Sequence, residues 1–164
     1  TILQTAGAYP EIISVHDLML HDYGFGYFVV SMRIEGYKKD SGKLYTASHQ
    51  ISFELYQKFH CDCFIQIDYL LHDEALTHTI TEQIYSVLKK YSEEIRVDNF
   101  RLIENGSGFS AAFDMVYPNE QKKREDEIRN SITEKVRSEN PECHLAIKGI
   151  IRRERLSPHR YYKN

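Results

Sequence analysis

The chain has 164 residues, and its 24 acidic and 21 Lys or Arg side chains give a formal net charge of −3. That balance argues against a general nucleic-acid binder, and no run of about 18 apolar residues is present that could span a bilayer. Three cysteines are too few for a disulfide framework and favour a reducing, cytoplasmic environment. The first residue is Thr1 rather than Met, so we expect a fragment of a longer protein.

The first half of the chain predicts a helical stub, three strands and one longer helix. Two β-rich alternating runs are joined through Gly24 and Gly26, which is typical of a hairpin. Apolar side chains from Leu44 to Phe59 then recur at helical spacing, after a polar helix start at residues 40–42. The stub is expected near residues 2–8, and the strands over residues 12–20, 27–34 and 63–71.

The second half predicts the same elements in the same order. A long helix opens it, because apolar side chains from Leu76 to Tyr91 form one stripe. A charged helix lies further along and stops at Asn140-Pro141. The apolar positions of that helix are Ile128, Ile132 and Val136, and strands are expected over residues 95–103, 109–117 and 144–151.

Internal repetition is the most informative feature of the sequence. Residues 15–27 overlay residues 97–109 at a spacing of 82, with a G-x-G turn in each. Residues 64–71 overlay residues 144–151 at a spacing of 80. Each half therefore has the order α-β-β-α-β, and the first helix of the first unit is truncated.

We therefore predict an α+β fold of two tandem ferredoxin-like units, over residues 1–72 and 73–152, each with helices on one face of its sheet. Residues 153–164 are predicted to form a basic tail. The segment from Lys148 onward has a local excess of five positive charges and could touch anionic lipid headgroups. A solvated, disordered end is the competing interpretation.

Strand parity indicates which side chains the helices leave uncovered. Arg33, Glu35, Gln66 and Asp68 are predicted on the open side of the first sheet. Because three apolar side chains share that side, something should cover it, either the other repeat or a second chain. We favour a symmetric homodimer. The three apolar side chains are Tyr27, Val29 and Phe64.

Several short stretches carry a family resemblance through their order and spacing. In the first half they are Val15-His-Asp-Leu18, Asp22-Tyr-Gly-Phe-Gly26, Ser48-His49 and Ile65-Gln-Ile-Asp68. In the second half they are Val97-Asp-Asn-Phe-Arg101 and Phe113-Asp-Met-Val-Tyr-Pro118. Together they resemble the cytoplasmic domain of the cation diffusion facilitator (cation efflux) family, in the tandem version found in some bacterial members. The resemblance covers nearly the whole chain.

This resemblance implies a cytoplasmic appendage of a membrane transporter that exports divalent metal, usually zinc or a similar ion, in exchange for protons. Such a domain pairs two subunits and can bind metal. It lies on the cytoplasmic side of the membrane, beside the membrane-embedded part of the same transporter. The transport site itself lies in membrane helices, which this sequence does not contain.

The family's metal ligands are retained at three positions, which are His16, His49 and Asp68. Gln66 and Arg33 stand where the family often has ligand histidines, and a guanidinium has no lone pair to offer. Zinc or another divalent transition metal is the ion that such a site would bind. Our hypothesis is that Arg33 replaces the ion by pairing with Asp68. The alternative for the two histidines is a hydrogen-bonded strand residue and a surface helix residue.

The second repeat is predicted to be structural, because Asp98 replaces His16 and Lys148 replaces Asp68. His60-Cys-Asp-Cys63 also offers donors suited to zinc or copper, but a helix-to-strand junction with small apolar cysteines is the favoured interpretation. No catalytic motif is present, so we do not expect an enzyme. The competing function is a stand-alone ferredoxin-like sensor that binds an amino acid or nucleotide.

Overall fold

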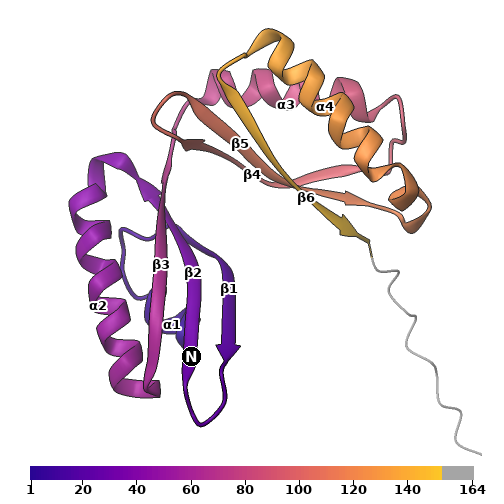
Figure 1. The fold of residues 1–164 in the computed structure, drawn as a ribbon. Coiled ribbons are helices and arrows are strands. Elements are labelled where there is room, and N and C mark those ends of the chain that lie inside the picture. The colour runs from indigo at the N-terminus through magenta and orange to yellow at the C-terminus, as the bar shows by residue number, and fades with distance from the viewer. Residues whose placement is uncertain (153–164) are drawn as a thin grey trace, which may run out of the picture. The chain divides into compact units, whose positions relative to one another are not determined.

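The computed structural model describes residues 1–152, and the predicted basic tail at 153–164 lies outside them (Figure 1). The chain divides into two compact units. The first holds Thr1–Asp73 and Leu102–Gly106, and the second holds Glu74–Arg101 and the chain from Ser107 onward. Both units combine helices with mixed parallel and antiparallel strands, which confirms the predicted α+β class. No helix in the described part of the chain is long and apolar enough to cross a membrane.

The first unit consists of α1 (Ile2–Ala6), β1 (Ser14–Asp22), β2 (Phe28–Tyr37), the 3₁₀ turn η1 (Lys38–Asp40), α2 (Ser41–Phe59) and β3 (Cys61–Leu70). The central strand β2 pairs with β1 antiparallel and with β3 parallel. α2 connects the two parallel strands and covers one face of the sheet (Figure 1). The short α1 begins with a capping box in which the side chains of Thr1 and Gln4 satisfy backbone groups.

Alternation along β2 buries one set of side chains against α2. Val30, Met32 and Ile34 pack in one cluster with Ile51 and Leu55 of α2. Burying each of these side chains stabilises the fold by roughly 1.5–3 kcal/mol. The core therefore lies on the helix side of the sheet, as predicted.

The other parity of the sheet is only partly open. Tyr27 and Phe64 are exposed as expected, whereas Val29, Glu35 and Asp68 are buried. The expectation of an uncovered position is therefore wrong for those last three side chains.

The second unit repeats this plan with a longer first helix. It consists of α3 (Glu74–Leu88), β4 (Arg96–Glu104), β5 (Phe109–Tyr117), the 3₁₀ turn η2 (Asn119–Arg124), α4 (Glu125–Glu139) and β6 (Cys143–Ile151). α3 packs along α4, where the Gln83 amide donates to a Glu139 carboxylate oxygen at 2.7 Å. α3 has 15 residues and α1 has five, so the predicted truncation is present.

Strand register corrects the sequence alignment of the two repeats. Phe28 lies opposite Cys61, and Phe109 lies opposite Cys143. Arg33 then faces Gln66 in the first unit at the place where Asp114 faces Lys148 in the second. Lys148 therefore corresponds to Gln66 and not to Asp68, because the loop that shortens precedes β5 rather than β6.

The same backbone irregularity occurs in both units. Asp17 of β1 and Asn99 of β4 have φ values of 51° and 53°, and the β1–β2 register shifts between His16 and Met19. Asp and Asn tolerate this left-handed conformation better than most residues because their short polar side chains bond locally. A left-handed residue is therefore part of the repeating unit, and in β1 the β-bulge that accompanies it re-aims the side chains nearby.

Candidate functional site

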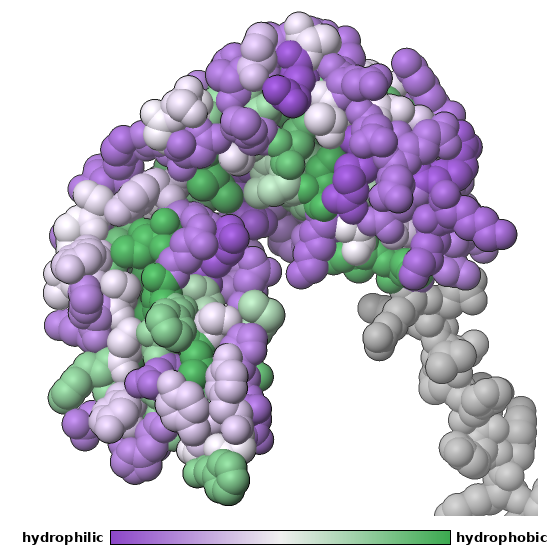
Figure 2. Space-filling model, viewed as in Figure 1, coloured by the Kyte–Doolittle hydropathy of each residue, from purple (hydrophilic) through white to green (hydrophobic). Residues whose placement is uncertain are grey.

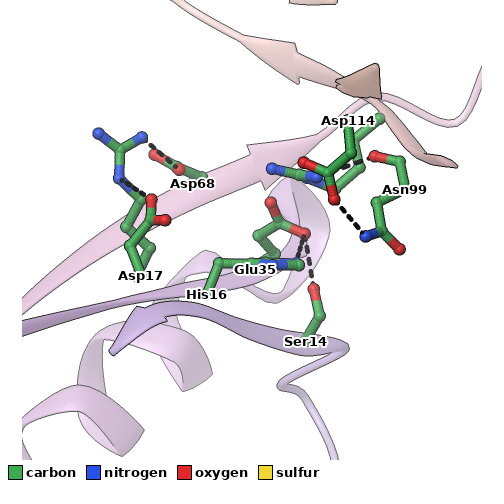
Figure 3. Close-up of polar contacts among 9 residues, drawn as sticks. Ser14, His16, Asp17, Glu35, Asp68, Asn99 and Asp114 are labelled. Atoms are coloured by element: carbon green, nitrogen blue, oxygen red, sulfur yellow. Dashed lines mark hydrogen bonds and ion pairs between the residues drawn. The ribbon is translucent and has the colours of Figure 1, made fainter. Parts of the chain in front are cut away.

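Arg33 is the centre of a charged cluster on the face of the first sheet opposite α2 (Figure 3). Its Nε lies 3.3 Å from Asp17 Oδ2, and its Nη1 lies 3.3 Å from Asp68 Oδ2. The Gln66 amide donates to the other Asp68 oxygen at 2.9 Å. The ion pair between Arg33 and Asp68 that the sequence predicts is therefore present. The β1 bulge supplies the second carboxylate, since it turns Asp17 toward the guanidinium.

His16 lies on the same face but has a different partner. Its Nε2 is 3.1 Å from Glu35 Oε2, and the Ser14 hydroxyl donates to that same oxygen at 2.6 Å (Figure 3). The Glu35 side chain is only 1% exposed. Glu35 is thus a buried carboxylate, and one of its oxygens lies beside both a hydroxyl and the imidazole that the family resemblance assigns to a metal.

His49 is not brought together with His16 and Asp68. It lies on the exposed side of α2, with its ring 4.5 Å from the Tyr45 ring. α2 packs on the opposite face of the sheet from Arg33 and its partners. Across residues 1–152, no group of three or more His, Cys, Asp or Glu side chains is arranged to hold a metal ion.

The residues present on the open face do not fit a zinc site. Zinc needs three or four convergent donors at about 2.0–2.3 Å. Arg33 supplies a fixed positive charge and no lone pair at the centre of the cluster. Both Asp68 oxygens already accept hydrogen bonds, from Arg33 and Gln66.

The corresponding face of the second unit has an inverted charge pattern. Asn99, the left-handed residue of β4, donates from Nδ2 to Asp114 Oδ2 at 2.6 Å (Figure 3). Asp114 occupies the position of Arg33, and Lys148 is its neighbour on β6. In each unit an Asp or Asn with a left-handed backbone thus contacts a charged side chain on the next strand.

The three cysteines are placed as packing residues. Cys61 and Cys143 are buried, and Cys63 is partly buried. Burial raises the pKa of the Cys63 thiol to about 11, so this side chain is a neutral thiol near neutral pH. His60 caps the C-terminus of α2 with a left-handed backbone, φ 52°. These placements agree with the interpretation of His60–Cys63 as a helix-to-strand junction.

An open groove of about 630 Å³ lies between α2 and the segment that follows α1. The Tyr9 hydroxyl donates to Glu54 Oε1 at 2.8 Å across it. Figure 2 shows hydrophobic side chains among the polar ones on the visible surface of the first unit. The residues that line the groove are Tyr9, Tyr45, Thr46, His49, Gln50, Phe53 and Glu54.

The aromatic lining of this groove could have been predicted from the sequence, but not from the apolar spacing that predicts the buried face of α2. Tyr45, His49, Phe53 and Tyr56 follow one another by four, four and three residues, so they form a second stripe on α2. All four are exposed, which separates them from the buried stripe that predicted the helix.

No protein-family model matches the chain, and no curated protein matches it.

Proposed function

We propose that this chain is the dimerisation and regulatory region of a divalent-metal efflux transporter of the cation diffusion facilitator type, lying on the cytoplasmic side of the membrane. Two tandem α-β-β-α-β units support this proposal, because they agree with the order of the family landmarks along the sequence. The observation that carries it is the charged cluster at Arg33, which stands where the family often places a metal ligand.

In this proposal Arg33 takes the role of a bound ion. A divalent cation would draw carboxylates from neighbouring strands together, and the Arg33 guanidinium does so for Asp17 and Asp68 at 3.3 Å each. Unlike a metal, this charge is covalently attached and does not depend on metal concentration or on pH in the physiological range. Pairing of subunits would then be permanent rather than metal-induced.

A domain of this kind acts on its transporter by favouring one spacing of the paired membrane parts. A ligand shifts that balance only by its differential affinity for the two arrangements. With Arg33 in place, the chain holds the metal-bound arrangement without metal. We therefore expect a homodimer of the purified chain whose association constant is unchanged by zinc.

The direct test restores the family's donors. In the double variant Arg33→His, Gln66→His, two imidazoles face each other on neighbouring strands beside Asp68, and His16 lies opposite position 33 on β1. Calorimetry should detect stoichiometric zinc binding by this variant and none by the wild-type chain. Arg33→Met is the matched control, because it removes the positive charge without adding a ligand.

Two outcomes would contradict the proposal. Tight, stoichiometric zinc binding by the wild-type chain would show that Arg33 does not replace the ion. A strict monomer in sedimentation equilibrium at high protein concentration, for the wild type and the double variant alike, would remove the dimerisation role.

A further inference from the structure

The groove along α2 combines aromatic ring faces with one negative charge. Tyr45 and Phe53 are each more than 60% exposed, and the Tyr9 hydroxyl completes the wall by bonding to Glu54. Glu54 is the only Asp, Glu, Lys or Arg among the residues that line the groove. The Lys58 ammonium, 2.9 Å from Glu54 Oε2, and the Tyr9 hydroxyl hold the pKa of the Glu54 carboxyl below its ordinary value. Glu54 therefore stays ionised near neutral pH and offsets the positive charge of Lys58.

The internal repeat shows that the fold does not require this surface. Ala47, Ile51 and Leu55 on the buried side of α2 correspond, at a spacing of 81, to Ile128, Ile132 and Val136 of α4. The same spacing turns the exposed aromatic stripe of α2 into charged or polar side chains on α4. Tyr45, His49, Phe53 and Tyr56 become Asp126, Asn130, Glu134 and Arg137.

In the second unit, the tyrosine that corresponds to Tyr9 contacts a cation. Tyr91 follows α3 as Tyr9 follows α1, and the Arg124 guanidinium lies 4.7 Å from the centroid of the Tyr91 ring. Within residues 1–152, the cations that lie over tyrosine rings are Arg124 at Tyr91 and Lys39 at Tyr37. The tyrosine of the second unit therefore has a cation from its own chain, and the groove at Tyr9 is open.

We propose that the α2 groove binds a small organic cation that carries an alkylated ammonium group. The faces of Tyr9, Tyr45 and Phe53 attract a cation through their ring quadrupoles, and Glu54 keeps the positive charge of Lys58 beside the groove from repelling it. The volume of about 630 Å³ is within the range of sites for small organic ligands. This site lies on the opposite side of the first unit from Arg33, and it does not depend on the transporter role.

The test compares choline with 3,3-dimethylbutan-1-ol, which has the same shape without the charge. NMR spectra of the full 164-residue chain follow the ring signals of Tyr9, Tyr45 and Phe53 during each titration. Choline should shift these signals saturably, and its dissociation constant should be about tenfold or more below that of the alcohol.

Variants assign the effect to the groove. Phe53→Leu and Glu54→Gln should each weaken choline binding at least about fivefold, because one removes a ring face and the other removes the charge. Tyr56→Leu is the control, since Tyr56 belongs to the same exposed stripe but does not line the groove. Unchanged backbone spectra away from α2 show that each variant is folded.

Three results would overturn the inference. Equal affinities for choline and the alcohol would make the groove an apolar docking face without cation selectivity. Absence of saturable shifts with choline at millimolar concentration would remove the site. Choline binding that Phe53→Leu and Glu54→Gln both leave unchanged would place the ligand elsewhere on the chain.

Discussion

Asp68 is 8% exposed, and its two oxygens accept hydrogen bonds from Arg33 and Gln66. Burying a carboxylate without a cation is costly, so the stability of this face depends on the guanidinium. The predicted pairing of Arg33 with Asp68 followed from parity and from the parallel arrangement of two strands. The contribution of Asp17 could not be predicted, because a bulge moves it out of the alternation that parity assumes.

The first prediction concerns that pair. Arg33→Met should lower the free energy of unfolding by about 1–3 kcal/mol, because it leaves the Asp68 carboxylate buried with only the Gln66 amide. Adding Asp68→Asn should recover most of the loss. Urea unfolding of the four chains of the double-mutant cycle measures the coupling. An Arg33→Met effect of equal size in both backgrounds would show that the two side chains act independently.

Tyr117 and Glu125 of the second unit are a coupled pair of titratable side chains. The Tyr117 hydroxyl donates to the Glu125 carboxylate. Burial, and then this hydrogen bond, raise the pKa of Tyr117 to about 12. Its pKa in the unfolded chain is about 10. The hydroxyl therefore contributes stability that is complete below pH 10 and is lost as the pH rises from about 10 toward 12.

The second prediction follows from the raised pKa of Tyr117 in the folded chain. Tyr117→Phe should reduce the alkaline loss of stability between about pH 10 and 11.5, because no phenol remains to ionise on unfolding. Thermal unfolding as a function of pH provides the measurement. Tyr9→Phe is a parallel case in the first unit, since burial and Glu54 raise the pKa of Tyr9 to about 12 as well. An unchanged alkaline slope in Tyr117→Phe would contradict the assignment.

At the scale of elements, α2 illustrates most of the sequence rules that predict where a helix starts, which face it buries and where it ends. Its N-terminal signal, its buried stripe and its end before a strand are all predictable from spacing. Its C-terminal residue is not the usual glycine, because His60 takes the left-handed conformation with φ 52° and donates its N–H to the Tyr56 carbonyl. A non-glycine residue in that conformation costs about 1 kcal/mol.

The third prediction uses two histidines of this region. His60→Gly should raise the free energy of unfolding by about 0.5–1 kcal/mol, because glycine adopts the left-handed conformation without strain. His49→Gly, in the middle of α2, should lower it by up to about 1 kcal/mol. Chemical denaturation of both variants checks the pair. Destabilisation by both substitutions would mean that the ring of His60 contributes more than its backbone conformation costs.

Strands were predicted within three residues of their observed bounds, because alternation and turn glycines mark them well. The alignment of residues 64–71 with residues 144–151 at a spacing of 80 was wrong, because it matched apolar residues that do not occupy equivalent positions in the two sheets. Of the candidate metal ligands, only His16 and Asp68 share a face. The exposed position of His49 follows from the buried stripe of α2, and it agrees with the alternative interpretation of His49 as a surface helix residue.

At the scale of the whole molecule, two separate sets of buried side chains support two units. Ile51 in α2 and Ile132 in α4 are equivalent positions of the repeat, and both are 0% exposed. Each unit therefore has its own hydrophobic core with its own stability. The predicted doubling of one plan is visible in the order of the elements and in the left-handed residues Asp17 and Asn99, whereas the surfaces of the two units differ in charge and aromatic content.

The fourth prediction compares these twin positions. Ile51→Ala and Ile132→Ala should each cost about 2–5 kcal/mol in the unit that holds them, because each creates a cavity in a closed core. Hydrogen exchange read by mass spectrometry should accelerate in α2, β2 and β3 for the first variant. It should accelerate in α4, β5 and β6 for the second. Acceleration throughout the described chain in both variants would show one cooperative core.

The bulge at Asp17 has a consequence for solubility. β1 is the first strand in its sheet, so one of its edges has no neighbouring strand in the sheet order. A regular edge of that kind could recruit extended segments from other molecules and begin fibrillar aggregation. The kink at Asp17 interrupts the row of backbone donors and acceptors and places a carboxylate in it. Replacing this bulge with a straight strand would therefore favour edge-to-edge polymerisation of the protein through β1.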